Sequence, residues 1–180
     1  ELTEIDSKFG DADHGLTMAK IAGAISEAVD AAEGGIQSML DDAAMAVMTL
    51  NGGSAVPLWN TWLDGLQEEA PEGEEIDVAG LKAIFAKALE ELEDMSGAKV
   101  GDKTMMDALI PASEAVAAYT GDSADELFDA AAQAAAQGAE ATKQYVSKFG
   151  RAKSYGTKTI GTPDAGAVSM SWFFQGLARE

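Results

Sequence analysis

The densest group of chemically versatile side chains lies near the N-terminus, in the segment Asp6-Ser7-Lys8-Phe9-Gly10-Asp11-Ala12-Asp13-His14-Gly15. Hard oxygen ligands grouped in this way suit Mg²⁺, which keeps several waters and takes further ligands from phosphates. Asp11 and Asp13 flank a small residue, so in an extended loop their side chains would point the same way. Asp6 reaches them if the residues before it are helical. The pattern predicts a magnesium site, and a solvated acidic turn or a set of helix N-caps without metal is the competing interpretation.

His14 is the only histidine of the chain and stands at the predicted start of a helix. A helix N-terminus binds anions because its backbone N–H groups are unpaired and its dipole is positive there. We therefore expect His14 to contact a phosphate or ribose, with Thr17 one turn further along the same helix. A purely structural histidine is the alternative.

Three further segments place glycine beside polar or basic residues just before predicted helices: residues 51–55, 97–105 and 150–166. In the first, adjacent glycines let backbone N–H groups approach a ligand. The second matches neither a Walker loop nor a dinucleotide fingerprint. The third holds Arg151, one of two arginines in the chain, and is suited to neutralising a phosphate. Taken singly, each is equally explained as an ordinary turn, a helix connection capped by Asp102, or a basic surface loop.

The elements that must position these segments are predicted to be helices. Apolar residues recur at helical spacing between Gly-containing breaks, which predicts helices at about residues 15–32, 36–50, 55–69, 77–95, 104–119, 123–148 and 164–178. Asp77 is predicted to be an N-cap, Ser123 and Glu126 a capping box, and Pro111 a kink. No series of alternating strands is present. The sequence thus predicts one all-α domain over residues 1–180, with short connections between antiparallel neighbours.

Composition narrows the classes of partner. The formal net charge is −19, which disfavours nucleic acid and anionic membranes. A nucleotide is also an anion, and divalent cations between carboxylates and phosphates would reconcile the two. There is no cysteine, which suits a reducing, cytoplasmic location, and no apolar run or signal peptide directs the chain to a membrane. The large aromatic residues are expected in the core or an interface: Trp59, Trp62, Trp172, Phe173 and Phe174.

Taken together, the four segments resemble the L subunit of the dihydroxyacetone kinase family, in order and over nearly the whole chain. The matching motifs are Asp6 with Gly10-Asp11-Ala12-Asp13-His14-Gly15, Gly52-Gly53 with Pro57-Leu58, Gly101-Asp102-Lys103-Thr104-Met105, and Gly150-Arg151-Ala152 with Asp164-Ala165-Gly166-Ala167. The resemblance implies an antiparallel helical barrel of about eight helices, the first largely absent from this chain, with a nucleotide site at one end.

The resemblance also implies which residues bind. Asp6, Asp11 and Asp13 would hold magnesium, with two ions expected beside ADP or ATP. The nucleotide contacts would fall on His14, Gly15, Leu16, Thr17, Ser54, Ala55, Gly97, Met105, Arg151, Asp164, Ala165 and Gly166.

Two turns depart from the family pattern. The family's Gly-Gly-Ala-Ser-Gly turn is Gly52-Gly53-Ser54-Ala55-Val56 here, and valine lacks the backbone freedom of glycine. The family's Asp-Pro-Gly is Asp164-Ala165-Gly166, with the proline one place before the aspartate. We expect altered phosphate contacts or specificity rather than loss of binding.

The resemblance implies a phosphoryl-donor unit that serves a ketose held on a separate K subunit, and we assign no acid, base or nucleophile to this chain. Two donors stay open: a phosphohistidine protein of the phosphotransferase system that rephosphorylates bound ADP, which is favoured, and exchanging ATP. The ketose is dihydroxyacetone or erythrulose. A fatty-acid kinase domain is disfavoured by His14, and a homodimer is left open. The alternative from another class is a non-catalytic Mg-nucleotide-binding regulatory module.

Overall fold

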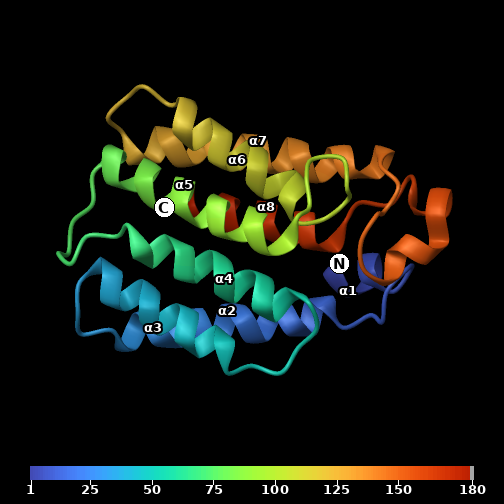
Figure 1. Ribbon diagram of the computed structural model, residues 1–180, viewed down its shortest axis with the longest axis horizontal. Helices are drawn as coiled ribbons and strands as arrows, with labels where there is room; N and C mark the ends of the chain where they lie inside the picture. The colour runs from blue at the N-terminus through green and yellow to red at the C-terminus, as the bar shows by residue number, and fades with distance from the viewer. Residues whose placement is uncertain (179–180) are drawn as a thin grey trace. The chain divides into compact units, whose positions relative to one another are not determined.

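The structure, a computed structural model, describes residues 1–178, and within that range it contains helices and turns but no β-strand (Figure 1). The all-α prediction is therefore confirmed. The helices are α1 (Leu2–Asp6), α2 (His14–Ala31), α3 (Ile36–Met48), α4 (Ala55–Glu68), α5 (Val78–Ser96), α6 (Met106–Ala118), α7 (Ala124–Ala141) and α8 (Ala165–Leu177), with 3₁₀ helices η1 (Thr142–Gln144) and η2 (Arg151–Thr159).

The chain divides into two compact units, which we describe one at a time. One unit comprises residues 1–15 and the chain from Ala98 onward, and the other comprises Leu16–Gly97. The single domain expected from the sequence stays a prediction.

The unit of residues 16–97 packs α4 against α3 and α5. Trp59 and Trp62 of α4 are buried and meet edge to face, with ring centroids 5.6 Å apart. Phe85 of α5 lies 6.1 Å from the Trp62 ring. Such aromatic pairs add to the stabilisation from buried apolar area, so α4 forms the centre of this unit.

The other unit packs α6, α7 and α8 against one another and sets the short α1 against α8. Its core contains Leu109 of α6, Leu127 of α7 and Phe174 of α8, all fully buried. Helices α6 and α7 approach closely at Gly138, where a β-carbon would collide with the backbone oxygen of Asp107. Because Asp107 also organises a loop of the candidate site, this packing bears on the site.

Several local predictions are confirmed. Asp77 caps α5 by accepting the N–H of Gly80 at 2.8 Å. Ser123 caps α7 by accepting the N–H of Glu126. The predicted capping box also requires the Glu126 carboxylate to accept the N–H of Ser123, and within the described residues this second bond is not formed. That carboxylate accepts from the Tyr119 hydroxyl, whose oxygen accepts the Ser123 N–H.

Two other predictions need correction. The helix expected to reach residue 148 ends at Ala141 and continues only as η1. The basic segment of residues 150–166, expected to be a loop, contains η2 over Arg151–Thr159, with a break at Gly156, where φ is 55°. Trp59, Trp62 and Phe174 are buried in the core, whereas Trp172 is 41% exposed, so of the two positions expected for it, core or interface, only the interface stays a prediction. Helix α6 runs through Pro111, and the kink expected there also stays a prediction.

Within residues 1–178, none of the helices combines the length and the apolar character that crossing a bilayer demands.

Candidate metal and nucleotide site

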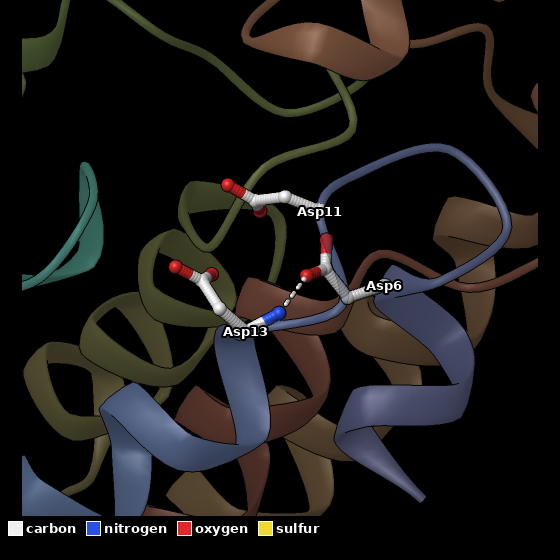
Figure 2. A group of neighbouring side chains, drawn as sticks. All are labelled: Asp6, Asp11 and Asp13. Atoms are coloured by element: carbon white, nitrogen blue, oxygen red, sulfur yellow. Dashed lines mark hydrogen bonds between the residues drawn. The ribbon is translucent and has the colours of Figure 1, made fainter.

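Asp6, the last residue of α1, organises the start of α2 (Figure 2). One oxygen of its carboxylate accepts the N–H of Asp13 at 3.0 Å and that of His14 at 3.2 Å. These are among the N–H groups that a helix N-terminus leaves unpaired. A β-carbon at Gly10 would collide with the Asp6 carboxylate, so the fold-back of the loop requires glycine there. The prediction that a helix before Asp6 lets it reach the other aspartates is confirmed.

The loop between α1 and α2 brings the three aspartates together in an unexpected way. Ala12 has a φ of 62°, in the left-handed region, so the extended loop that we predicted is wrong. Nevertheless, one carboxylate oxygen from each of Asp6, Asp11 and Asp13 lies within 4.8 Å of the others. Figure 2 shows the three side chains gathered beside the first turn of α2. This set of hard oxygen donors fits a divalent cation such as Mg²⁺.

The electrostatics of the acidic group agree with that fit. Burial raises the pKa of Asp13 above its usual value, and the charges of Asp11 and Asp6 raise it further, whereas the charge of Arg151 lowers it. Like charges at short range disfavour ionisation of each other. A bound cation would reverse this effect, because its own charge would be the largest in the site.

Arg151, the first residue of η2, pairs with one of these aspartates. Its Nη1 lies 2.7 Å from a carboxylate oxygen of Asp11, and its side chain is 71% exposed. The ring of Tyr155 in the same helix lies 5.2 Å from that of Phe9. The predicted basic segment is therefore brought to the acidic group, across a long separation in sequence.

His14 links the start of α2 to the start of α8. Its Nε2 lies 3.1 Å from the hydroxyl oxygen of Ser169, and that hydroxyl donates its proton to the backbone oxygen of Gly166. Burial is the main cause of the lowered pKa of His14, against the raising effects of Asp6, Asp13 and the backbone of Ala165. A neutral imidazole thus lies beside the predicted nucleotide residues 164–166.

Asp164 caps α8 by accepting the N–H of Ala167 at 2.8 Å. Its own N–H is accepted by the hydroxyl of Thr142 at 2.8 Å. Burial is the largest cause of a pKa raised to about 7, and the nearby charge of Asp107 raises the pKa further while that of Lys103 lowers it. Next to Asp164, a β-carbon on Gly166 would lie 3.4 Å from the backbone nitrogen of Met105, so two predicted contact residues are neighbours.

The loop of residues 97–105 is held from within by Asp107, a buried carboxylate that the sequence did not single out. One of its oxygens accepts the N–H of Gly101 at 2.6 Å and the other that of Thr104 at 2.7 Å. Asp102 accepts the N–H of Lys99 and pairs with the ammonium of Lys148. Lys103 is also buried. The family motif of residues 101–105 includes Lys103 but predicted no role for it, and no motif marks Asp107, because only distant parts of the chain bury these two side chains.

The remaining predicted contacts lie in the unit of residues 16–97. Leu16 is exposed and Thr17 is buried. A β-carbon at Gly52 would come within 3 Å of the side chains of Thr17 and Val56, so the altered turn is closely packed against α2. Ser54 is the N-cap residue of α4, and Ala55 is its first residue. Gly97 ends α5 in the left-handed conformation, with φ of 63°.

The described residues form an all-helical protein, and three of its carboxylates gather at the start of a helix, in an arrangement that could hold a divalent cation. The DAK2 domain matches residues 8–179, and the chain belongs to this family. The family resemblance predicted from the motifs is confirmed.

Similar proteins are kinases or kinase subunits. The chain is 36% identical over 188 residues to the L-erythrulose kinase of Pectobacterium atrosepticum, covering 99% of this chain and 31% of that protein. It is 30% identical over 180 residues to the ADP-binding subunit DhaL of the PTS-dependent dihydroxyacetone kinase of Lactococcus lactis, covering 98% of this chain and 85% of that protein. The chain thus spans about a third of the erythrulose kinases it matches.

A solved structure shares the fold. The dihydroxyacetone kinase of C. freundii, in complex with AMP-PNP and Mg²⁺, matches with a TM-score of 0.72 and 26% identity. The match covers 98% of this chain and 30% of that one.

Proposed function

We propose that this chain is the Mg-nucleotide-binding, phosphoryl-donor unit of a dihydroxyacetone-type kinase. The observation that carries the proposal is the meeting of Asp6, Asp11 and Asp13 within 4.8 Å at the start of α2, in a chain of the DAK2 family. Relatives named as ADP-binding subunits, and a related structure holding AMP-PNP and Mg²⁺, support the same ligands here.

In this proposal the three aspartates would hold magnesium, with two ions expected, against the phosphates of ADP or ATP. Bound metal would neutralise charge on the transferred phosphoryl group and keep it in line for attack. The carboxylate of Asp6 is already oriented before metal binds, because it accepts hydrogen bonds from two backbone N–H groups. Preorganised ligands lose little freedom on binding. The proposal assigns no acid, base or nucleophile to this chain, so catalysis would rest on positioning and electrostatics.

The other residues would bind the nucleotide. His14, whose pKa is lowered mainly by burial, would stand beside the phosphates, at a helix N-terminus that attracts anions. Arg151 would exchange its bond to Asp11 for a phosphate when metal neutralises that carboxylate. Gly15, Leu16, Thr17, Ser54, Ala55, Gly97, Met105, Asp164, Ala165 and Gly166 complete the proposed contacts.

The partner would be a K subunit or domain that holds the ketose. The donor would be a phosphohistidine protein of the phosphotransferase system, as the name of the Lactococcus relative suggests. Erythrulose phosphorylation with ATP is the second candidate, because relatives at 36% identity are erythrulose kinases. The cytoplasmic location and a homodimer stay predictions.

The test changes one carboxylate of the group and one outside it. Asp13→Asn should weaken Mg-dependent ADP binding by more than about tenfold, since even an indirect partner of a metal ligand is worth about that much. Asp30→Asn, at an exposed aspartate near the far end of α2, removes the same charge and should change binding by less than about twofold. Calorimetric titration with ADP, with and without magnesium, measures both.

Wild-type affinity in Asp13→Asn would reject the metal assignment. Binding by itself does not separate an enzyme from a regulatory module. The purified chain should show no ketose phosphorylation alone and should phosphorylate when a K subunit and donor are added. Activity without a partner would refute the divided site, and inactivity with every partner and donor would favour the module.

A further inference from the structure

Lys103 is a buried lysine whose ammonium bridges two other segments of the chain. The residue is 4% exposed. Its Nζ donates to the backbone oxygen of Thr142 at 2.6 Å and to that of Thr162 at 2.5 Å. These acceptors lie 39 and 59 residues further along the chain. Hydrogen bonds from a charged donor are stronger than neutral ones, so these three segments are held together firmly.

The backbone directs this side chain inward at some cost. Lys103 has a φ of 62°, a left-handed conformation that residues with a side chain rarely adopt. The surrounding loop enforces it, because the carboxylate of Asp107 binds the N–H groups of Gly101 and Thr104 on either side. Strain of this kind persists where neighbouring contacts determine the conformation.

Burial of an ammonium is unfavourable without compensation. Burial lowers the pKa of Lys103, and the charges of Asp164 and Asp107 oppose that effect. If the fold required only that this space be filled, an apolar side chain of similar size would serve. The lysine is distinguished by its donors, which bind two carbonyl oxygens on separate segments.

Both segments lead to predicted nucleotide contacts. Thr162 stands two residues before Asp164, and the hydroxyl of Thr142 accepts the N–H of Asp164. Lys103 itself stands two residues before Met105, which lies against Gly166. The ammonium is therefore placed between the loop of residues 97–105 and the turn of residues 162–166.

We propose that Lys103 is a positioning residue of the nucleotide site, whose ammonium sets the spacing between the 97–105 loop and the 162–166 turn so that both contact one nucleotide. This inference rests on the proposed function. Lys103 acts through backbone carbonyls and touches neither the nucleotide nor the metal.

The test compares Lys103→Met with Lys99→Met, which removes the same charge from an exposed position of the same loop. Lys103→Met should weaken MgADP binding by about tenfold or more, because two charge-assisted hydrogen bonds are lost. Lys99→Met should stay within about twofold. Lys103→Arg keeps the charge with a different fork of donors and should recover part of the affinity.

A second measurement separates positioning from general folding. Mn²⁺ affinity of the nucleotide-free protein, followed by electron paramagnetic resonance, should be unchanged in Lys103→Met, because the carboxylates lie on residues 6–13. Loss of nucleotide affinity with intact metal affinity is the expected pattern. An equal loss of MgADP affinity and Mn²⁺ affinity in Lys103→Met would overturn the proposal. MgADP affinity at the wild-type level would also overturn it, even if the melting temperature of the variant fell.

If Lys103→Met does not fold, Lys103→Arg decides alone: a weakening of about threefold or more is expected, and wild-type affinity would refute the role. The outcomes also separate the two proposals. Unchanged MgADP binding in the variants would overturn only the role of Lys103. A wild-type protein that binds no MgADP would overturn the proposed function and this inference together.

Discussion

At the scale of single residues, the acidic group depends on side chains with two roles. Asp6 holds the first turn of α2 through two N–H groups and also contributes an oxygen to the cluster. Asp11 belongs to the cluster and pairs with Arg151. A carboxylate shared between a guanidinium and a cation is the point at which metal and nucleotide binding would influence each other.

Arg151→Ala should therefore have opposite effects on two ligands. Without the guanidinium, Asp11 is free for metal, so Mn²⁺ should bind the nucleotide-free protein about two- to fivefold more tightly, the range for an exposed ion pair. MgADP should bind more weakly, because the proposed phosphate contact is lost. Titration with each ligand measures the two effects.

Lys153→Ala is the matched control, since it removes an exposed cation from the same 3₁₀ helix. It should leave metal affinity at the wild-type level. Unchanged or weaker Mn²⁺ binding in Arg151→Ala would contradict the competition between Arg151 and metal for Asp11.

At the scale of elements, α8 begins with a carboxyl group whose protonation is linked to folding. The pKa of Asp164 is raised to about 7 from a usual 3.8, chiefly by burial. The folded protein therefore binds this proton more tightly than the unfolded chain does. The resulting stabilisation is complete below pH 3.8 and is lost as the pH rises through 7.

Asp164→Asn should remove this pH dependence, because asparagine caps a helix about as well as aspartate and does not titrate. The stability of the variant relative to the wild type should rise between pH 4 and about 7. Urea unfolding of both nucleotide-free proteins across that pH range measures the difference in their free energies of unfolding. Groups that titrate equally in both proteins cancel in this difference. A difference independent of pH would contradict the raised pKa.

Close packing of α6 and α7 makes a second prediction at this scale. Alanine normally stabilises a helix interior relative to glycine. At Gly138, however, the added carbon meets the backbone oxygen of Asp107, which cannot rotate away. Gly138→Ala should lower the free energy of unfolding by about 1–3 kcal/mol.

Gly23→Ala is its control, because a β-carbon at Gly23 meets nothing within 4 Å. This substitution in α2 should raise the free energy of unfolding by about 0.5–1 kcal/mol. Denaturant melts of the two variants give the comparison. Stabilisation by Gly138→Ala would show that α6 and α7 can separate there at little cost.

At the scale of the whole molecule, the charge dominates. A net charge of −19 on 180 residues repels itself in the compact state, and mobile ions screen that repulsion. The exposed ion pairs that salt would weaken are individually worth little. Screening of the net charge should therefore outweigh the loss of ion pairs.

Raising KCl from about 0.01 M to about 0.5 M, in the presence of EDTA, should raise the melting temperature, because the Debye length falls from about 30 Å to a few ångströms. EDTA removes divalent cations, so the effect is not metal binding. Sucrose at matched osmolarity is the comparison without charge. A melting temperature that falls with KCl would mean that ion pairs outweigh self-repulsion.

The sequence alone determined the helices and the acidic group. Helices α2 to α8 follow from apolar spacing and from caps such as Asp77, Ser123 and Asp164, which act within a few residues. The three aspartates and His14 lie within residues 6–14, so the short chain between them already limits their separation.

Tertiary structure decided the contacts that span long stretches of chain. The acidic loop turns through a left-handed residue, Ala12, where an extended backbone was predicted. Ser169 meets His14 across 155 residues, and Thr142 meets Lys103 across 39. No local pattern encodes such pairs, because burial and partners arise only when distant helices pack, and burial is what turns Lys103 and Asp107 from ordinary charged residues into interior ones.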